Sequence, residues 1–256
     1  MVDVAATALV AGAGLLAGAV NALAGGGTLI TFPALLAAGL APISANTTSS
    51  VGLLSGYAGG SLAYRRELED QRERIRTLAA VSLIGGVAGA VLLLVTPAAA
   101  FRVLVPYLVL MSCALLAVQP RLAAWLKARR GVDAAPAGRH DIGLLVGVAV
   151  SAVYGSYFGA GLGVLLLAVL GLLLPDGVQH LNALKGLLSL FINVIGAGIF
   201  AIFGHVAWLF AAVLAVSALL GGVLGASLAR RIPAAALRMA VVVFGTLVAI
   251  VLLIRA

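Results

Sequence analysis

The sequence is poor in charged residues, acidic residues and cysteine. Only 9% of its 256 residues are charged and only 8 are Asp or Glu, whereas charged residues make up about 25% of an average soluble domain. The single cysteine, Cys113, cannot form a disulfide framework within one chain. No cluster of side chains has metal-ligand spacing, so we predict neither a metal site nor a cofactor.

Hydrophobic residues dominate the chain, at 63% of the sequence and a mean hydropathy of +1.21. A soluble core of this size could not bury so much apolar surface, so most of it must face lipid or other helices. The net charge of +8 does not indicate a nucleic-acid partner, because Lys and Arg fall in short gaps between apolar runs. Residues 1–25 carry Asp3 but no Lys or Arg, so we expect a retained first membrane segment rather than a secretion signal.

Apolar runs long enough to cross or deeply enter a bilayer occur at about ten places. They lie at 4–23, 28–40, 47–64, 78–95, 103–118, 142–160, 163–174, 183–203, 207–228 and 235–254. Two of them, 28–40 and 163–174, are shorter than the ~20 residues of an ordinary span, and both follow a glycine-rich break directly.

The two halves of the chain coincide when one is shifted by 136 residues against the other. The matched pairs are Gly25 with Gly161, Gly27 with Gly163, Asn46 with Asn182, Pro97 with Pro233, and Arg102 with Arg238. We infer an internal duplication, with a first membrane repeat at 1–118, a basic cytoplasmic linker at 119–141 and a second membrane repeat at 142–256. The glycine pairs Gly85/Gly89 and Gly221/Gly225 are assigned to helix packing.

The basic residues predict how the repeats are oriented. Three gaps, after residue 64, between 119 and 141, and after residue 228, hold 13 of the 16 Lys and Arg residues. Five crossings per half place all three on one face, which the positive-inside rule makes cytoplasmic. An odd number of crossings inserts the halves in opposite orientations. The sequence thus predicts an all-α polytopic membrane protein of two five-segment repeats in inverted topology, each with a glycine-broken helical hairpin, as in many secondary transporters.

The first candidate binding element is the break at Gly25, Gly26 and Gly27, which follows Asn21 and precedes Thr28. Consecutive glycines are poor helix interior and expose backbone N–H groups. A half-helix beginning near Thr28 would direct its N–H groups and positive dipole end into the membrane interior, where they could bind an anion. The alternative interpretation is a tight helix–helix crossing.

The second element is the polar run from Asn46 to Ser50, which offers amide and hydroxyl groups at a helix start. A helix cap would explain Asn46 alone but not the whole run. The equivalent stretch of the second half keeps Asn182 and adds Lys185, which is the basic residue placed well inside an apolar run. Lys185 either has a function or extends its ammonium group to the membrane surface.

The third element is the second-half break from Tyr154 to Gly163, where Tyr157 takes the register of Asn21. Its glycine spacing is not a dinucleotide loop, because no strand–helix context surrounds it. No acidic residue falls clearly within an apolar run, so a carboxylate-based cation site or proton relay is not expected and the interior suits an anion.

These motifs resemble those of the TauE/SafE sulfite-exporter family. The similarity lies in Gly18–Leu36, in Ala45–Ser49 and in Gly155–Gly163, and it extends over essentially the whole chain. It implies a bacterial inner-membrane transporter that exports sulfite, sulfonates or related small anions. The second half departs from the triple glycine, with Leu162 at the register of Gly26, so the two half-sites are expected to differ.

Together these elements predict a secondary transporter, not an enzyme, that works by alternating access between the repeats. Its expected partners are a small anionic substrate and the lipid bilayer but no nucleic acid, and a homodimer is left open. A non-transporting membrane assembly subunit and a passive anion channel stay as alternatives. The predicted substrate-binding residues are Asn21, Gly25, Gly26, Gly27, Thr28, Asn46, Thr47, Thr48, Ser49, Tyr157, Gly161, Gly163, Asn182 and Lys185.

Overall fold

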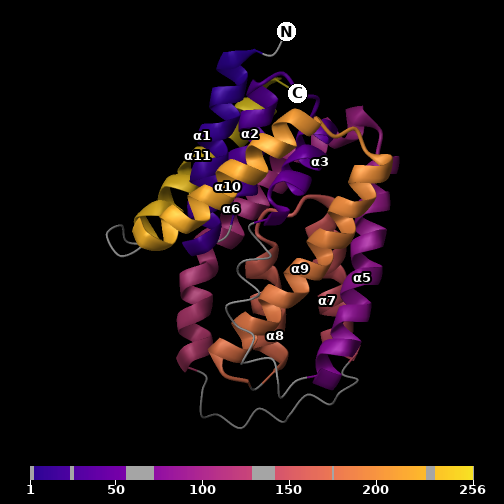
Figure 1. The fold of residues 1–256 in the computed structure, drawn as a ribbon. Coiled ribbons are helices and arrows are strands. Elements are labelled where there is room, and N and C mark those ends of the chain that lie inside the picture. Colours follow the sequence, from indigo (N-terminus) through magenta and orange to yellow (C-terminus); the bar gives the residue numbers. More distant parts are fainter. Residues whose placement is uncertain are drawn as a thin grey trace.

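The computed structural model describes residues 3–23, 26–55, 72–128, 142–174, 176–228 and 234–255, and every regular element within these ranges is a helix (Figure 1). The helices are α1 (Val4–Leu23), α2 (Thr28–Ala37), α3 (Pro42–Gly52), α5 (Arg72–Val95), α6 (Ala98–Ala128), α7 (Ile142–Tyr157), α8 (Leu162–Leu173), α9 (Val178–Phe203), α10 (Trp208–Leu228) and α11 (Ala234–Arg255).

Five of the described helices are long and apolar enough to cross a bilayer. Their apolar stretches are Val4–Asn21, Glu73–Val95, Ala98–Leu126, Gln179–Phe203 and Ala235–Ile254. Large hydrophobic side chains such as Ile84, Val216 and Phe244 are exposed on the outside of the molecule, as lipid contact requires. The chain is therefore an all-helical polytopic membrane protein, and this part of the prediction is confirmed.

The helices differ from the predicted apolar runs mainly at their ends. Helix α3 begins at Pro42, not at residue 47, because proline fits the first turn of a helix. Helix α5 begins at Arg72, before the apolar run at 78, and α6 continues to Ala128, beyond the run that ends at 118. Polar residues extend these helices past the apolar stretch that reveals them in the sequence. Residues 56–64 of the predicted segment 47–64 lie outside the described residues.

Helices from the two halves of the chain pack in pairs. Helix α1 packs along α10, and α5 packs along α7. A methyl group on Gly18 would lie 2.0 Å from the carbonyl oxygen of Ala218, and one on Gly89 would lie 2.2 Å from that of Val153. Only glycine permits such close backbone contact. The packing role predicted for Gly85, Gly89 and Gly221 is confirmed, since each lies against the backbone of the partner helix.

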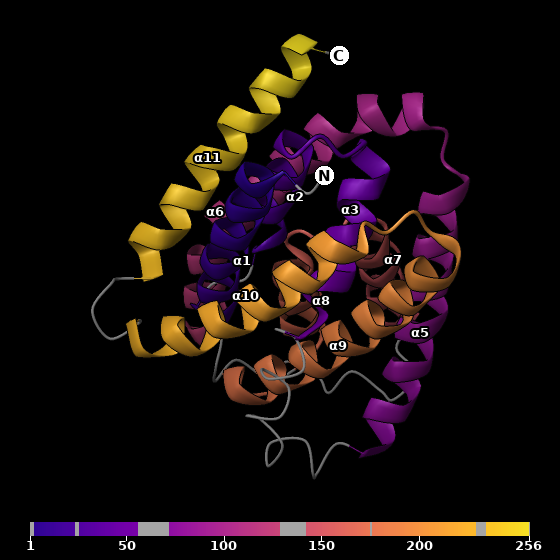
Figure 2. The same cartoon turned by 45° about the horizontal axis from the view of Figure 1, so that its top comes forward.

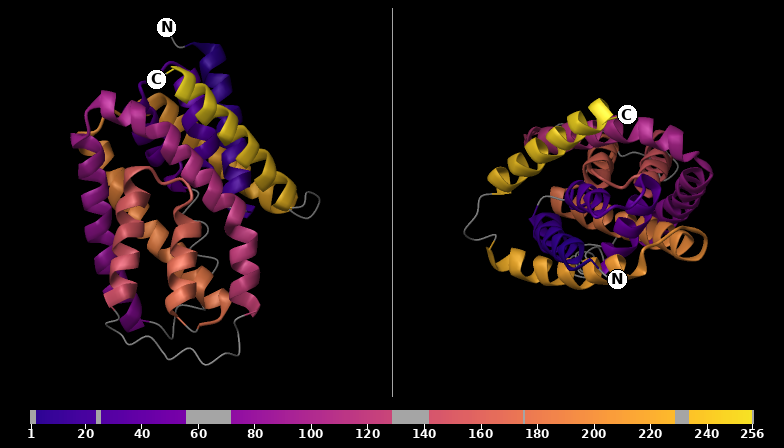
Figure 3. Two further views of the ribbon diagram at one scale, coloured as in Figure 1. Left: turned by 180° about the vertical axis from the view of Figure 1, so that it is seen from behind. Right: turned by 90° about the horizontal axis from the view of Figure 1, so that it is seen from above.

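The α1–α2 and α7–α8 pairs are helical hairpins at opposite ends of the molecule. Helices α1 and α2 occupy the end that carries both termini, whereas α7 and α8 occupy the other end (Figure 1). From behind, α7 and α8 lie between α5 and α6 (Figure 3). Helix α11 lies at the periphery, where it packs on α6 (Figure 2).

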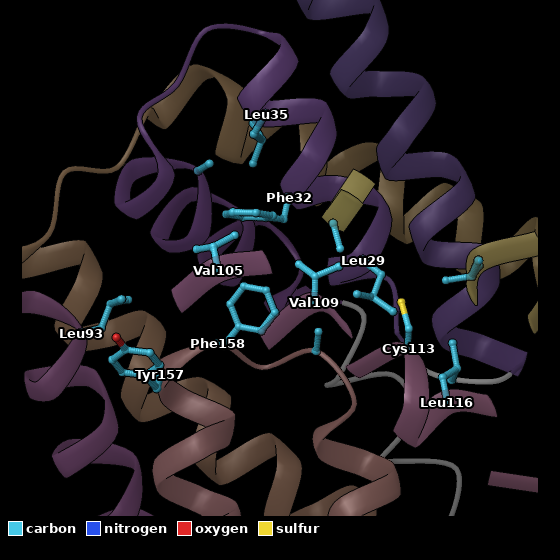
Figure 4. Packing of buried hydrophobic residues seen from close by; sticks show 14 of the residues in the cluster. Leu29, Phe32, Leu35, Leu93, Val105, Val109, Cys113, Leu116, Tyr157 and Phe158 are labelled. Atoms are coloured by element: carbon cyan, nitrogen blue, oxygen red, sulfur yellow. The ribbon is translucent and has the colours of Figure 1, made fainter. Parts of the chain in front are cut away.

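The tips of the two hairpins meet on α6. A methyl group on Gly26 would lie 3.2 Å from Leu116, and one on Gly161 would lie 3.3 Å from the neighbouring Leu115. The rings of Phe32 and Phe158 pack edge to face between the hairpins, with centroids 5.5 Å apart (Figure 4). Both breaks therefore lie at the same depth, inside the main hydrophobic core.

Candidate functional site

At the first hairpin tip, side chains of the same hairpin form hydrogen bonds with the backbone N–H and carbonyl groups of the break. Gly26 has a φ of +95°, a conformation that favours glycine. The Gly27 N–H donates to Asn21 Oδ1 over 2.8 Å, and Thr31 Oγ1 donates to the Gly27 carbonyl over 3.3 Å. The Thr31 hydroxyl also pairs with Ser49 Oγ of α3 at 2.6 Å. A hydrogen-bonded chain thus links α1, the break and α3.

The second tip turns at two left-handed glycines, Gly159 and Gly161, with φ values of +81° and +80°. The carbonyl oxygen of Ala160 between them accepts a hydrogen bond from the Tyr154 hydroxyl over 2.6 Å. Ser112 Oγ of α6 lies 3.0 Å from the same oxygen. This tip is therefore tied to α6 as well as to its own hairpin.

Asn46 joins the first half of the chain to the second tip. Its side chain is completely buried, and its Nδ2 donates to the backbone carbonyl of Tyr157 over 2.8 Å. This carbonyl can only accept, which fixes the amide with Nδ2 toward it. Asn46 Oδ1 then has no hydrogen-bond partner among the described residues. Asn46 is not a helix cap, since α3 begins at Pro42 and its N-cap residue is Ala41.

Thr47 and Thr48 point away from the tips, toward the connection between α9 and α10. Thr47 Oγ1 donates to the carbonyl of His205 over 3.2 Å, and Thr48 Oγ1 accepts from the N–H of Ala207 over 3.0 Å. Ser44 Oγ donates to the same His205 carbonyl over 2.7 Å. The predicted polar run therefore divides, with Asn46 and Ser49 at the hairpin tips and the two threonines at this connection.

Lys185 lies two turns into α9, next to the start of α8. Its Nζ donates to Asn182 Oδ1 over 3.1 Å, and a methyl group on Gly163 would lie 3.8 Å from Lys185 Cδ, which is an ordinary van der Waals contact. No ion pair between Lys185 and a carboxylate occurs in the part of the chain that the structure describes. The ammonium group and the N-terminal end of α8 are both favourable to an anion.

The remaining predicted site residues have less specific surroundings. Thr28 is buried in the first turn of α2, and Gly161 is the N-cap residue of α8. Tyr157 contributes its backbone carbonyl, while its hydroxyl lies 3.3 Å from Thr96 Oγ1. Gly25 lies outside the described residues.

Five buried or hydrogen-bonded polar residues were not among the predicted site residues. They are Thr31, Ser112, Tyr154, Ser156 and Ser189. Thr31, Tyr154 and Ser156 lie within the glycine-rich motifs themselves. Ser189 follows Lys185 by four residues, a spacing that puts both on one helix face.

The chain matches the family described as sulfite exporter TauE/SafE over residues 10–252. It is 27% identical over 213 residues to a probable membrane transporter protein, ORF9, of Sinorhizobium, covering 83% of this chain and 79% of that protein. It is 28% identical over 218 residues to the probable membrane transporter protein YfcA of Escherichia coli K12, covering 84% and 77%. A probable membrane transporter protein of Haemophilus influenzae is 27% identical over 222 residues, with coverage of 84% and 82%.

No solved structure gives a significant match to the chain. The family match covers both glycine breaks, the Asn46 helix and Lys185, and so includes every element of the candidate site. The chain belongs to the sulfite exporter TauE/SafE family.

Proposed function

We propose that the protein is a secondary transporter that exports a small anion, such as sulfite, a sulfonate or a related organic anion, across the bacterial inner membrane. The observation that carries this proposal is the buried Asn46, which joins α3 of the first half to the second hairpin tip and keeps an amide oxygen without a partner among the described residues. A buried polar atom without a partner is costly, so it indicates a bound group that the protein itself does not supply.

The helix positions support two five-segment repeats in inverted topology. Helices α3 and α9 begin at Pro42 and Val178, and α6 and α11 begin at Ala98 and Ala234, so both pairs are separated by the 136-residue shift of the sequence repeat. In the same repeat α1 corresponds to α7, and α5 corresponds to α10. The α1–α10 packing pair is therefore equivalent to the α7–α5 packing pair. Movement of one half against the other would expose a site at their junction to either side of the membrane.

The chemistry around the tips suits an anion. Helices α2 and α8 both begin at the tips and present positive dipole ends there. Lys185 adds a formal positive charge beside α8. An ionised sulfonate offers only acceptor oxygens to these groups. The free Asn46 Oδ1 requires a donor, which hydrogen sulfite would supply through its proton.

The membrane orientation is part of the same proposal. Arg74 forms an ion pair with Asp176, which ties the start of α5 to the connection between α8 and α9. The start of α5, with Arg74 and Arg76, and the end of α6, with Arg121, lie at the same end of the molecule (Figure 1), and we assign this end to the cytoplasm.

The experiment is uptake of sulfite, sulfoacetate and thiosulfate into vesicles that contain the purified protein, with a cation as negative control and Asn46→Leu alongside. Saturable uptake that accelerates when the same anion is present on the opposite side would support the transporter. Linear uptake without such acceleration would indicate a passive channel. No uptake above that of empty vesicles, across imposed proton and sodium gradients, would contradict the proposal and favour the assembly subunit.

A further inference from the structure

Four polar residues and a glycine lie along one face of the mostly apolar helix α9. Asn182, Lys185, Ser189, Asn193 and Gly196 follow one another at intervals of three or four residues. Such intervals place side chains above one another on a single face of an α-helix. We call these five residues the α9 polar face. An apolar membrane helix does not need such a face for packing in lipid, where polar side chains are costly.

The α9 polar face is directed at the second hairpin. At one end, the stem of Lys185 lies beside Gly163 at the start of α8. At the other end, a methyl group on Gly196 would lie 2.5 Å from Ser156 Oγ near the end of α7. Ser189 and Asn193 lie between these two contacts on the same face of α9, and Asn193 Nδ2 donates to the backbone carbonyl of Ser189 over 2.7 Å.

Within the described part of the chain, two hydroxyl groups along this line have no hydrogen-bond partner. Ser156 and Ser189 are each only 5% exposed, and neither Oγ atom has a partner among the described residues. A serine in a helix can bond the carbonyl four residues earlier, as Ser151 and Ser217 do here. The hydroxyls of Ser156 and Ser189 do not form this bond to the preceding turn of their helices. Their hydroxyls remain available to water or to a ligand.

The start of the line is exposed and its later residues are buried. Gln179 and His180, at the start of α9, are exposed, and Asn182 and Lys185 are partly buried. Ser189 and Asn193 are 5% and 8% exposed. The line ends at Ser156, whose neighbour Tyr157 is held by Asn46. Polar groups one helix turn apart thus follow one another from the surface at the α8–α9 connection toward the Asn46 junction.

We propose that the α9 polar face, together with Ser156, is the path by which an oxyanion passes between that surface and Asn46. Asn182 and Lys185 form its outer binding position, where the ammonium group attracts the anion. The hydroxyls of Ser189 and Ser156, and the amide hydrogen of Asn193 that is not donated to the Ser189 carbonyl, replace water around the anion along the buried part. The path deepens the proposed transport function and rests on it.

The test is the chemical accessibility of introduced cysteines. Cys113 is a buried residue of α6 that faces α11, so Cys113→Ser provides a background in which Ser189→Cys and Asn193→Cys can be introduced singly. Leu188→Cys, at a buried apolar position, and Val194→Cys, at an exposed position on the outside, are matched controls. The reagents are two membrane-impermeant methanethiosulfonates, one carrying a sulfonate and one carrying a quaternary ammonium group.

The path predicts that the sulfonate reagent modifies Ser189→Cys and Asn193→Cys about ten-fold faster than either control, since thiol reactivity depends on access. Sulfite should slow this reaction, and Lys185→Gln should slow it for the sulfonate reagent but not for the cationic one. Equal rates at test and control positions in protein that elutes as a single folded species would overturn the path.

Parallel sulfite uptake by the Cys113→Ser parent separates this inference from the proposed function. Uptake without cysteine reactivity would reject the path and leave the transporter in place. Reactivity that sulfite blocks, in a protein that takes up no anion, would support the path as a binding site and reject transport.

Discussion

Asn46 both holds the second hairpin tip and presents an unpartnered oxygen, and replacing it with leucine tests these two roles separately. Leucine branches at the same carbon atom but has no polar group. The buried carbonyl of Tyr157 would lose its donor, which costs about 1–3 kcal/mol. The same substitution would remove Asn46 Oδ1, whose unpartnered burial costs a similar amount. The two effects nearly cancel.

We therefore expect Asn46→Leu to change the free energy of unfolding by no more than about 1 kcal/mol, while anion uptake falls about ten-fold, the equivalent of about 1.4 kcal/mol. Asn46→Asp is the comparison. It keeps the shape but places a second acceptor against the Tyr157 carbonyl, so it should unfold more easily than Asn46→Leu.

Stability is measured by thermal unfolding in detergent, and uptake is measured in vesicles with equal amounts of folded protein. Uptake by Asn46→Leu at the wild-type rate would refute a binding role for this residue. A loss of stability equal to that of Asn46→Asp, with uptake falling only in proportion to the folded fraction, would show that Asn46 acts through structure alone.

Three further outcomes follow from the contacts. Gly18→Ala should lower the free energy of unfolding by about 1–3 kcal/mol, because the added methyl group would lie 2.0 Å from the Ala218 carbonyl oxygen. Gly12→Ala, whose methyl group would meet nothing within 4 Å, should be neutral or slightly stabilising, and thermal unfolding of both variants measures the difference. Thr48→Val should speed hydrogen exchange at the Ala207 amide. The control is Thr246→Val, whose hydroxyl bonds to Val242 within α11 and to Cys113 of α6 but not to this connection; unchanged exchange in Thr48→Val would show that the Thr48 hydroxyl does not hold the connection. Sulfite uptake should rise as the pH is lowered, because protonation gives the anion the donor that Asn46 Oδ1 lacks, while methanesulfonate uptake should not; parallel pH profiles for the two anions would contradict this match.

The sequence predicted most of the fold because long apolar runs and glycine breaks are local signals. Helix α1 has the bounds of the predicted run 4–23, and the short segments after the two breaks became α2 and α8. Helix ends outside the apolar runs were missed, as at Arg72 and Ala128, because polar helical residues resemble loop residues in composition.

The candidate site was predicted less completely, because its contacts join residues far apart in the chain. Asn46 was expected to donate to a substrate, yet its donor is used by Tyr157, and no local pattern reveals a partner 111 residues away. Thr47 and Thr48 belong to the same polar run, but the 100° turn between successive residues directs them to His205 and Ala207. Ser189 could have been found from its spacing to Lys185.

The two halves share glycine and asparagine at equivalent positions of the repeat but differ in the side chains around these positions. Gly27 and Gly163, like Asn46 and Asn182, occupy equivalent positions of the repeat, and both members of each pair lie at or beside a hairpin. At the register of Ser49, however, the second half has Lys185.

In the first half, the Ser49 hydroxyl pairs with Thr31, so these two groups satisfy each other within the protein. In the second half, Leu167 stands at the register of Thr31 and gives Lys185 no polar partner, so the ammonium group turns to Asn182 at the edge of the α9 polar face. The same fold position is thus closed by a neutral pair in one half and carries a positive charge in the other. A charge placed in only one half makes the attraction for an anion unequal at the two ends of the molecule. An asymmetry of this kind is what a transporter built from two equivalent repeats needs if its two access routes are to bind the substrate with different strength.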